Sequence, residues 1–321
     1  MILTVTINPL LEQRFTFNNV SPEIQNRNGK LQLAAGAKGI NVNRQLNILN
    51  VQNIALTFAG GTYGKLFRDS IKNDGIDFSL INTHTQTRIC SVIINSKEKS
   101  VSYYFSENQI ITKDETNKFI LKMEKMIQNC EVVIFSGSSP GEEADIIFPA
   151  GIEMANKYDK ISICDTYGRH LEKCYSATPR IVHNNIEEVV NSLQLNLNDE
   201  KDKLVFLDTL YSKGIKQVYL TDGDKNVYAS NFDFYYKLRV PNIKSVDSTG
   251  SGDAFVAGIA YGWHNKLAFD EQIKFAAALG TSNAQMVDVC NVPVDKARKL
   301  AESIEVHPIG KKIKIIDDTP N

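Results

Sequence analysis

The most constraining feature of the chain is an alternation of short apolar runs with longer segments of helical periodicity. The apolar runs, rich in β-branched residues, fall at residues 3–7, 53–58, 131–135, 160–164, 180–183 and 217–220. Apolar residues recur at spacings of three and four in segments 40–49, 112–127, 146–157, 201–213, 254–264 and 270–287. Strands that alternate with helices are joined by right-handed crossovers and form a mainly parallel sheet. The pattern predicts a doubly wound α/β domain with helices on both faces of the sheet.

Two stretches, residues 12–33 and 85–107, do not follow this alternation of strands and helices. Both contain polar-apolar alternation, for example over residues 87–94 and 99–105. Such alternation is typical of strands with one face exposed to solvent. These stretches therefore predict a small separate sheet that acts as a lid, and ordinary surface hairpins are the alternative. The predicted division is a main domain of residues 1–11, 34–84 and 108–310, a β lid of residues 12–33 and 85–107, and a C-terminal tail of residues 311–321.

Charge and cysteine pattern narrow the range of partners. The 36 basic and 37 acidic side chains leave a formal net charge of -1, so the chain offers no electrostatic footprint for nucleic acid or an anionic membrane. The cysteines are scattered without C-x-x-C spacing, which favours buried reduced thiols. The chain opens on a strand pattern without a signal-type segment, and it has no run of about 18 apolar residues. These features predict a cytoplasmic protein that binds small molecules.

The segment 247–253 reads Asp-Ser-Thr-Gly-Ser-Gly-Asp and leads into an apolar helical pattern. Gly250 and Gly252 allow a tight turn and the close approach of a ligand to the backbone. The unpaired N–H groups at a helix N-terminus suit an anion such as a phosphate. Asp253 adds a carboxylate at the same point, which can accept a hydroxyl proton. A Gly-rich turn with Asp253 as a simple cap is the alternative.

A second Gly-rich turn, residues 35–42, also opens a helical pattern. Lys38 offers a mobile positive charge, and Asn41 offers both a donor and an acceptor. This combination suits a phosphate and hydroxyl groups. A plain strand-to-helix turn would show the same glycines.

Polar residues follow two further predicted strands, at the edge where open α/β sheets bind their ligands. Asn185 and Glu188 are three residues apart, so an amide and a carboxylate on one helical face could hold water on Mg²⁺. Thr221 and Gly223 follow the next strand. Arg88, on the predicted lid, could donate two parallel hydrogen bonds to the phosphate of a sugar phosphate. Each of these features alone is also compatible with an ordinary polar surface.

Taken together, these residues resemble the ribokinase-like carbohydrate kinases of the pfkB family, most closely the branch of 1-phosphofructokinases and tagatose-6-phosphate kinases. The resemblance runs through nearly the whole chain in family order, over segments 4–9, 35–42, 135–140, 165–168, 185–188 and 247–258. It implies an α/β domain with a β-sheet lid. It also implies ATP and Mg²⁺ beside residues 250–253, with the sugar between Lys38, Asn41 and the lid.

The resemblance also implies roles by position. Asp253 is similar to the catalytic base, and Gly250, Ser251 and Gly252 are similar to the anion hole. The implied nucleotide and Mg²⁺ contacts are Asn185, Glu188, Thr221, Gly223 and Asn283, with Glu188 acting on the metal indirectly. The implied sugar contacts are Glu12, Gly36, Lys38, Asn41 and Arg88.

Several positions differ from the usual pattern of the branch. Glu12 stands where the branch usually has Asp, and Ala37 where it has Gly. Residues 183–185 read His-Asn-Asn in place of Lys-Pro-Asn, and the lid segment 99–108 lacks the usual Glu-Thr and Gly-Pro-Gly-Pro features. These differences bear on the identity of the sugar more than on phosphoryl transfer.

The sequence therefore predicts an ATP-dependent kinase that converts a ketohexose phosphate, of the fructose 1-phosphate or tagatose 6-phosphate type, to a bisphosphate. The first alternative is a ribokinase-like kinase of an unphosphorylated sugar or nucleoside, but a neutral sugar gives Lys38 and Arg88 nothing to pair with. The second is a non-catalytic sugar or nucleotide sensor, against which the intact Asp253 argues. An exposed lid edge often needs covering, so a homodimer through the lid is a further expectation.

Overall fold

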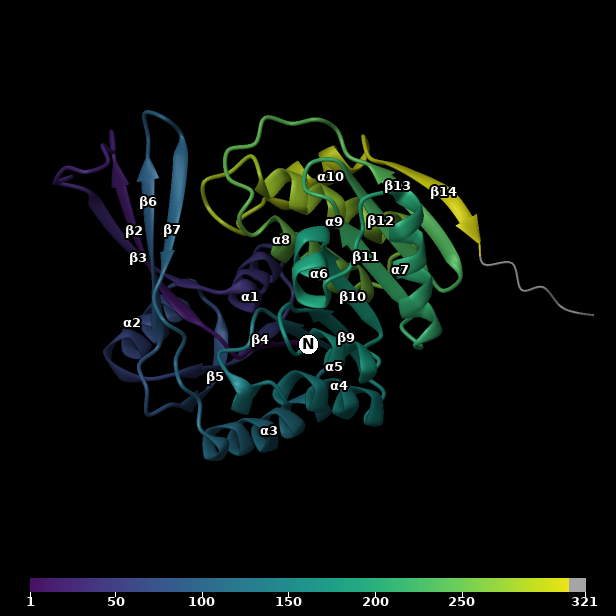
Figure 1. The fold of residues 1–321 in the computed structure, drawn as a ribbon, viewed down its shortest axis with the longest axis horizontal. Helices are drawn as coiled ribbons and strands as arrows, with labels where there is room; N and C mark the ends of the chain where they lie inside the picture. Colours follow the sequence, from purple (N-terminus) through teal and green to yellow (C-terminus); the bar gives the residue numbers. More distant parts are fainter. Residues whose placement is uncertain (312–321) are drawn as a thin grey trace, which may run out of the picture.

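The computed structural model describes residues 1–311, and its largest element is a twisted sheet of ten strands (Figure 1). Across the sheet the strands lie in the order β14 (Glu305–Lys311), β13 (Phe234–Arg239), β12 (Asn226–Asn231), β11 (Gln217–Thr221), β10 (Ile181–Asn185), β9 (Ile161–Asp165), β8 (Val132–Ser136), β1 (Ile2–Thr6), β4 (Asn53–Ala59) and β5 (Asp77–Asn82). Neighbouring strands from β5 to β11 are parallel, and those from β11 to β14 are antiparallel.

Helices cover both faces of this sheet and create two apolar cores. One core includes residues of α3 (Lys113–Gln128), α4 (Ile147–Lys157), α5 (Leu171–Ser176), α6 (Ile186–Leu193) and α7 (Glu200–Ser212). The other includes residues of α1 (Lys38–Ile48), α8 (Ser251–His264), α9 (Phe269–Asn283) and α10 (Val294–Ala301). Alternate strand residues point to opposite faces, so Val133 joins the first core and Val132 the second. This architecture confirms the predicted doubly wound α/β fold.

A smaller sheet projects from the main body at the upper left of Figure 1. Its strands lie in the order β3 (Lys30–Gly36), β2 (Leu10–Phe17), β6 (Arg88–Asn95) and β7 (Ser100–Phe105). The base of the sheet is anchored by α2 (Gly61–Asn73), whose Phe67 and Ile71 pack with Leu11 and Ala35. The alternating segments therefore form a separate sheet, as the sequence predicts, while their role as a lid stays a prediction.

The sequence analysis missed several elements. It predicted no strand for β5, at the edge of the parallel part of the sheet, or for the antiparallel strands β12, β13 and β14. It predicted no helix for α2, α5, α10 or the short 3₁₀ helix Glu142–Ala144, and of α6 it predicted only that Asn185 and Glu188 share one helical face. The helix α9 ends at Asn283, four residues before the predicted end. Lys311, the first residue of the predicted tail, instead pairs with Phe234 in the sheet. The rest of that tail, residues 312–321, lies outside the described residues.

No helix within residues 1–311 is both long and apolar enough to cross a membrane.

Candidate active site

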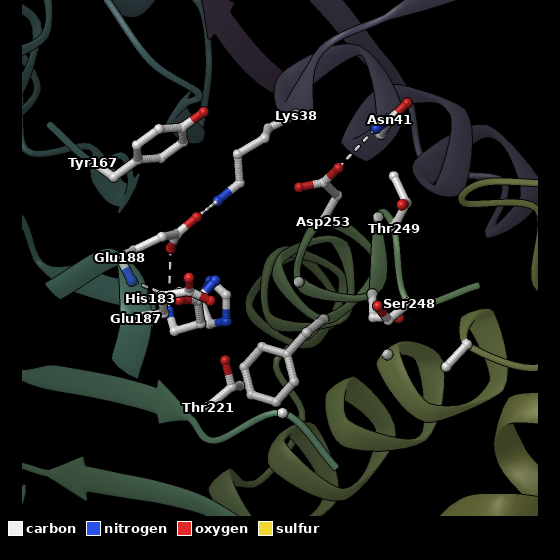
Figure 2. Close-up of a pocket in the computed structure, with 18 of the residues that line it drawn as sticks. Lys38, Asn41, Tyr167, His183, Glu187, Glu188, Thr221, Ser248, Thr249 and Asp253 are labelled. Atoms are coloured by element: carbon white, nitrogen blue, oxygen red, sulfur yellow. Dashed lines mark hydrogen bonds and ion pairs between the residues drawn. The ribbon is translucent and has the colours of Figure 1, made fainter. Parts of the chain in front are cut away.

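A cavity of about 1020 Å³ opens between the small sheet and the carboxyl ends of the parallel strands. Open α/β sheets bind their ligands at this edge. Twelve of the residues predicted from the sequence line the cavity: Glu12, Lys38, Asn41, Arg88, Asn185, Glu188, Thr221, Gly223, Gly250, Ser251, Gly252 and Asp253. Gly36 and Asn283 are not among the lining residues. The fold thus brings together residues that are up to 241 positions apart in the sequence, from Glu12 to Asp253. Figure 2 shows several of their side chains.

The loop before α8 presents a helix N-terminus to the cavity. Gly250 has φ 76°, in the left-handed region that favours glycine, and an added Cβ would come within 2.2 Å of Val289 Cγ1. No side chain within residues 1–311 caps this helix. The first N–H groups of α8 are therefore available to an anion in the cavity.

Asn283 supports this loop from behind. Its amide nitrogen donates to the carbonyl of Thr249 at 2.8 Å and to Ser251 Oγ at 3.2 Å, while its amide oxygen accepts from the backbone N–H of Cys290 at 2.7 Å. The side chain is buried and all its polar atoms have protein partners. Asn283 is therefore placed to hold the anion-binding loop rather than to contact a nucleotide directly.

Asp253 lies in the first turn of α8 and is only 4% exposed. Asn41 of α1 donates its amide N–H to Asp253 Oδ2 at 2.8 Å (Figure 2). The orientation of that amide is set by Arg44, which donates to Asn41 Oδ1 at 2.8 Å and is itself held by Asp74 at 2.7 Å. Sequence reasoning missed Arg44, although its position three residues after Asn41 on one helix was a usable signal.

The environment of Asp253 makes it a base suited to neutral pH. Burial, together with the carboxylates of Asp165 and Glu188, raises the pKa of Asp253 to about 7, although Lys38 and the Asn41 hydrogen bond act in the opposite direction. A general base is most effective when its pKa lies near the working pH. Asp253 can therefore accept a proton from a hydroxyl group that approaches the N-terminus of α8.

Lys38 is held by two carboxylates. Its ammonium nitrogen lies 2.9 Å from Asp165 Oδ1 and 2.9 Å from Glu188 Oε1. Although burial by itself lowers the pKa of Lys38, these carboxylates and Asp253 raise it well above its usual value. The sequence had coupled Lys38 with Arg88 as two cations for one phosphate. In the structure the charge of Lys38 is balanced by protein carboxylates.

His183 and Asp165 extend this network, and sequence reasoning gave neither a role in the site. The Asp165 carboxylate lies 3.0 Å from His183 Nδ1 and accepts from Ser136 Oγ at 2.8 Å. The imidazole stacks on Phe255 of α8, with ring centroids 5.1 Å apart. Its Nε2 is buried and has no hydrogen-bond partner within residues 1–311. Asp165 ends β9 and His183 lies in the middle of the neighbouring strand β10, so the contact depends on the pairing of the two strands and no local motif indicated it.

Asn185 and Glu188 form a capping box at the start of α6. Asn185 Oδ1 accepts from the backbone N–H of Glu188 at 2.7 Å, and Glu188 Oε2 accepts from that of Asn185 at 3.1 Å. The pair therefore has a structural function in addition to any role with a ligand. Within residues 1–311 no cluster of three or more His, Cys, Asp or Glu side chains could hold a metal by itself. One carboxylate beside the cavity nevertheless fits Mg²⁺, which usually keeps several waters and binds through substrate phosphates.

The cavity reaches Thr221, at the end of β11 (Figure 2). It also includes Gly223 and a less polar region. Gly223 has φ 56°, which suits the turn that follows the strand. Apolar side chains line this end: Val227, Val240, Pro241, Ile243, Ala277 and Ala284. A slot of this kind, next to an anion-binding helix N-terminus, fits the flat base and the phosphates of a nucleotide.

Arg88 marks the opposite end of the cavity, at the start of β6. Its terminal nitrogens donate to Asn108 Oδ1 at 3.3 Å and to the carbonyl of Asn8 at 3.1 Å, and its buried Nε has no partner within residues 1–311. No carboxylate in the described chain forms an ion pair with it. Burial lowers the pKa of Arg88, but from so high a value that the guanidinium stays charged. Arg88 is thus a positive charge in a cavity wall with room for an anion.

Glu12 and Gly36 lie where the small sheet meets the main body. Glu12 Oε2 accepts from Arg14 Nη1 at 2.7 Å, so the carboxylate that lines the cavity is already ion-paired. Gly36 pairs with Leu10 across the strands, and an added Cβ would come within 2.8 Å of Glu12 Oε1. Gly36 therefore makes room for Glu12 and does not itself line the cavity.

Comparisons with known proteins identify the family of the chain. The model of the pfkB family of carbohydrate kinases matches residues 10–296. The tagatose-6-phosphate kinase of Staphylococcus epidermidis is 27% identical over 309 residues, which cover 95% of this chain and 99% of that protein.

Solved structures share the fold. A "possible 1-phosphofructokinase" of Thermotoga maritima has a TM-score of 0.85 at 21% identity and covers 96% of this chain and 99% of its own. The phosphofructokinase-2 of Escherichia coli in complex with fructose 6-phosphate has a TM-score of 0.83 at 19% identity, with 94% and 98% covered. Because the family match spans most of its length, the chain belongs to the pfkB family of carbohydrate kinases, enzymes that transfer a phosphoryl group to a hydroxyl group.

Proposed function

We propose that this kinase transfers the γ-phosphoryl group of ATP to a hydroxyl of a ketohexose phosphate, of the fructose 1-phosphate or tagatose 6-phosphate type, to give a bisphosphate. Asp253 is the general base, and the N–H groups of Gly250, Ser251 and Gly252 are the anion hole. The observation that carries the proposal is the place of Asp253, whose carboxylate has a pKa of about 7 and lies on the same helix turn that offers those N–H groups.

The chain's own residues account for the transfer step. Because Asn41 occupies Oδ2 of Asp253, the carboxylate is oriented and Oδ1 is left for the acceptor hydroxyl. Asp253 takes the hydroxyl proton as the oxygen attacks the γ-phosphorus and the bond to the leaving ADP oxygen breaks. The helix N-terminus stabilises the charge that spreads over the transferred oxygens. Positioning and electrostatics supply most of the catalysis in reactions of this class.

ATP and Mg²⁺ are the cofactors of this proposal. Thr221, Gly223 and the apolar slot would hold the nucleoside, and Glu188 would hold Mg²⁺ through water beside Asn185. The metal, when bound, offsets the charge of the phosphates. Lys38 then acts from the protein side, because its two ion pairs hold the carboxylates of Asp165 and Glu188 in place, and its charge lowers the pKa of Asp165.

Arg88 supports a phosphorylated acceptor. A guanidinium without a carboxylate partner, in a cavity wall, is suited to a phosphate dianion and has little to gain from a neutral sugar. The named relative at 27% identity acts on tagatose 6-phosphate, a sugar of this kind. The alternative, a ribokinase-like kinase of a free sugar or nucleoside, would leave Arg88 facing no charge.

The assembly and location are further parts of the proposal. Leu31 and Tyr104 are large, exposed apolar side chains on the face of the small sheet that points away from the cavity, and a second copy would cover them in a homodimer. A chain of this composition, with ATP as a co-substrate, fits the cytoplasm.

An acceptor screen tests the proposed function. The purified protein is given Mg-ATP with fructose 1-phosphate, tagatose 6-phosphate, fructose 6-phosphate or free fructose, and ADP formation is followed together with product mass. We expect a bisphosphate from at least one phosphorylated ketohexose and much slower turnover of free fructose. Equal or faster turnover of the free sugar would favour the ribokinase-like alternative, and ATP binding without transfer to any acceptor would favour the sensor.

A further inference from the structure

Tyr103, on strand β7 of the small sheet, reaches across the cavity to the loop that precedes α8. Its hydroxyl donates to Asp247 Oδ2 at 2.8 Å. The second oxygen of the same carboxylate, Oδ1, accepts the backbone N–H of Thr249 at 2.9 Å. One carboxylate is therefore bonded to the small sheet on one side and to the anion-binding loop on the other.

The rest of this loop is fixed from the opposite side. Asn283 binds the carbonyl of Thr249 at 2.8 Å, and Cys290 Sγ lies 3.2 Å from the carbonyl of Gly250. The N–H groups of residues 246 and 247 both bond to the carbonyl of Ala284. Within residues 1–311, Tyr103 is thus the residue through which the small sheet contacts this loop, by its hydrogen bond to Asp247 and by a further interaction with the side chain of Thr249.

In this hydrogen bond the Tyr103 hydroxyl is the donor and the Asp247 carboxylate is the acceptor. Burial and the hydrogen bond to Asp247 raise the pKa of Tyr103, so the phenol stays protonated and donates. A hydrogen bond to an ionised carboxylate is stronger than one between neutral groups. A second contact from the small sheet to this side of the cavity is long: Arg14 Nη2 lies 3.5 Å from the carbonyl of Val287.

We propose that the hydrogen bond between Tyr103 and Asp247 couples closure of the small sheet over the acceptor to the geometry of the anion-binding loop. Tyr103 and Asp247 are then positioning residues. They act on the reaction through Thr249 and the N–H groups that follow, without touching the reacting atoms. This inference rests on the proposed function for its kinetic consequence, but the contact itself is present in the protein without ligand.

The strand supplies a matched control. Tyr104 is the next residue along β7 and is 62% exposed on the other face of the sheet, away from Asp247. Removing the hydroxyl of Tyr103 deletes the bond to Asp247 with little change in packing, whereas the same change at Tyr104 deletes no contact to the loop. Any general effect of losing a tyrosine hydroxyl on this strand should appear in both variants.

The first experiment needs no acceptor and so does not depend on the proposed function. Hydrogen exchange of the amides of residues 247–252 is measured in the unliganded wild type, Tyr103→Phe, Tyr104→Phe and Asp247→Asn. We expect Tyr103→Phe and Asp247→Asn to raise exchange in this loop about tenfold, which corresponds to about 1.4 kcal/mol, with Tyr104→Phe at the wild-type rate. Wild-type exchange in Tyr103→Phe would overturn the inference.

The second experiment measures the coupling itself. The affinity of a non-hydrolysable ATP analogue is measured with and without a saturating acceptor, using tagatose 6-phosphate and fructose 1-phosphate as probes. We expect the acceptor to tighten analogue binding about tenfold in the wild type and less than about twofold in Tyr103→Phe. Affinity without acceptor should be the same in both, and kcat of Tyr103→Phe should fall more than KM rises.

The two proposals fail in different ways. A wild type that phosphorylates neither probe contradicts the proposed function, while the exchange measurement still decides the Tyr103 contact. A wild type that does phosphorylate a probe, with full coupling and kcat retained in Tyr103→Phe, overturns the coupling alone.

Discussion

The two walls of the cavity are built differently. On the wall formed by α1 and α8, Asp253, Asn41 and Arg44 form a buried chain of hydrogen bonds, each shorter than 3 Å. On the wall formed by the small sheet, Arg88 makes longer contacts, at 3.1 and 3.3 Å, and keeps its Nε free of partners within residues 1–311. The difference indicates a fixed wall on the side where we propose that the proton and the phosphoryl group move. The other wall has room to accept a ligand charge.

Of all the substitutions, Asp253→Asn, in the wall formed by α1 and α8, should have the largest effect on the rate of the reaction. The amide has the same shape but cannot take the proton, so we expect kcat to fall by about 10²- to 10⁴-fold while binding of an ATP analogue persists. Since burial disfavours the charged carboxylate, the variant should be at least as stable to heat as the wild type at pH 8. The matched control is Asp270→Asn, an exposed acid at the start of α9. A variant with near-normal kcat would remove Asp253 from the role of base.

Lys38→Met tests whether Lys38 belongs to the fixed wall. The change leaves the buried carboxylate of Asp165 without its ammonium partner, and breaking such a pair typically costs about 3–5 kcal/mol in the free energy of unfolding. Lys118→Met, which removes an exposed pair with Asp114, should cost less than about 1 kcal/mol. The measurement is urea unfolding of both variants. Similar small losses would show that the Lys38 network contributes little to stability.

The pH dependence of the reaction tests whether Asp253, with its raised pKa, is the general base. Because burial raises its pKa to about 7, the base is increasingly protonated below that pH, and kcat/KM should fall about tenfold per pH unit there and level off above it. The charge of Lys38 lowers the pKa of Asp253, so the midpoint should move to higher pH in Lys38→Met. A profile that is flat between about pH 5.5 and 8 would contradict the assignment.

The smallest expected effect is at the nucleotide end. Glu188→Gln removes a charge beside the proposed metal position while retaining much of the capping box, so the Mg²⁺ concentration for half-maximal rate should rise several-fold, with little change in KM for the acceptor. A titration of rate against Mg²⁺ checks this. An unchanged titration would leave Glu188 with its structural roles in the cap and the Lys38 ion pair.

The sequence predicted the cavity wall formed by α1 and α8 better than the wall formed by the small sheet. Gly250 to Asp253 and Asn41 lie in short segments whose local pattern, a Gly-rich turn leading into a helix, indicates where the backbone will expose N–H groups. Most of the parallel core was predictable for the same local reason, because its strands are short apolar runs, except for β5 at the edge, which mixes polar with apolar residues. Strands β12 to β14 are antiparallel and lacked that signal, because β12 and β13 mix aromatic with polar residues and β14 mixes apolar with polar residues and contains Pro308.

Contacts between distant segments could not be predicted in this way. The contact of Asp165 with His183 depends on the pairing of β9 with β10. The contacts of Arg88 with Asn8 and of Tyr103 with Asp247 depend on how strands of the small sheet meet loops of the main body. The two ion pairs of Lys38 are of the same kind, and they changed the expected partner of this residue. Asn283 had a family counterpart that contacts nucleotide, yet its position here behind the loop follows from packing against residues 249–251 and 290.

The central claim is that Arg88 selects a phosphorylated acceptor while the wall of α1 and α8 performs the transfer. A competition assay tests it most directly. Wild type and Arg88→Ala each receive Mg-ATP with an equimolar mixture of tagatose 6-phosphate and free tagatose, and the ratio of the two products gives the ratio of kcat/KM values. A charge-assisted contact is worth roughly 1.5–3 kcal/mol, so the loss of Arg88 should lower the preference for the phosphorylated sugar by about ten- to a hundredfold. Turnover of the free sugar should stay nearly unchanged. A product ratio equal in the two proteins would contradict the claim.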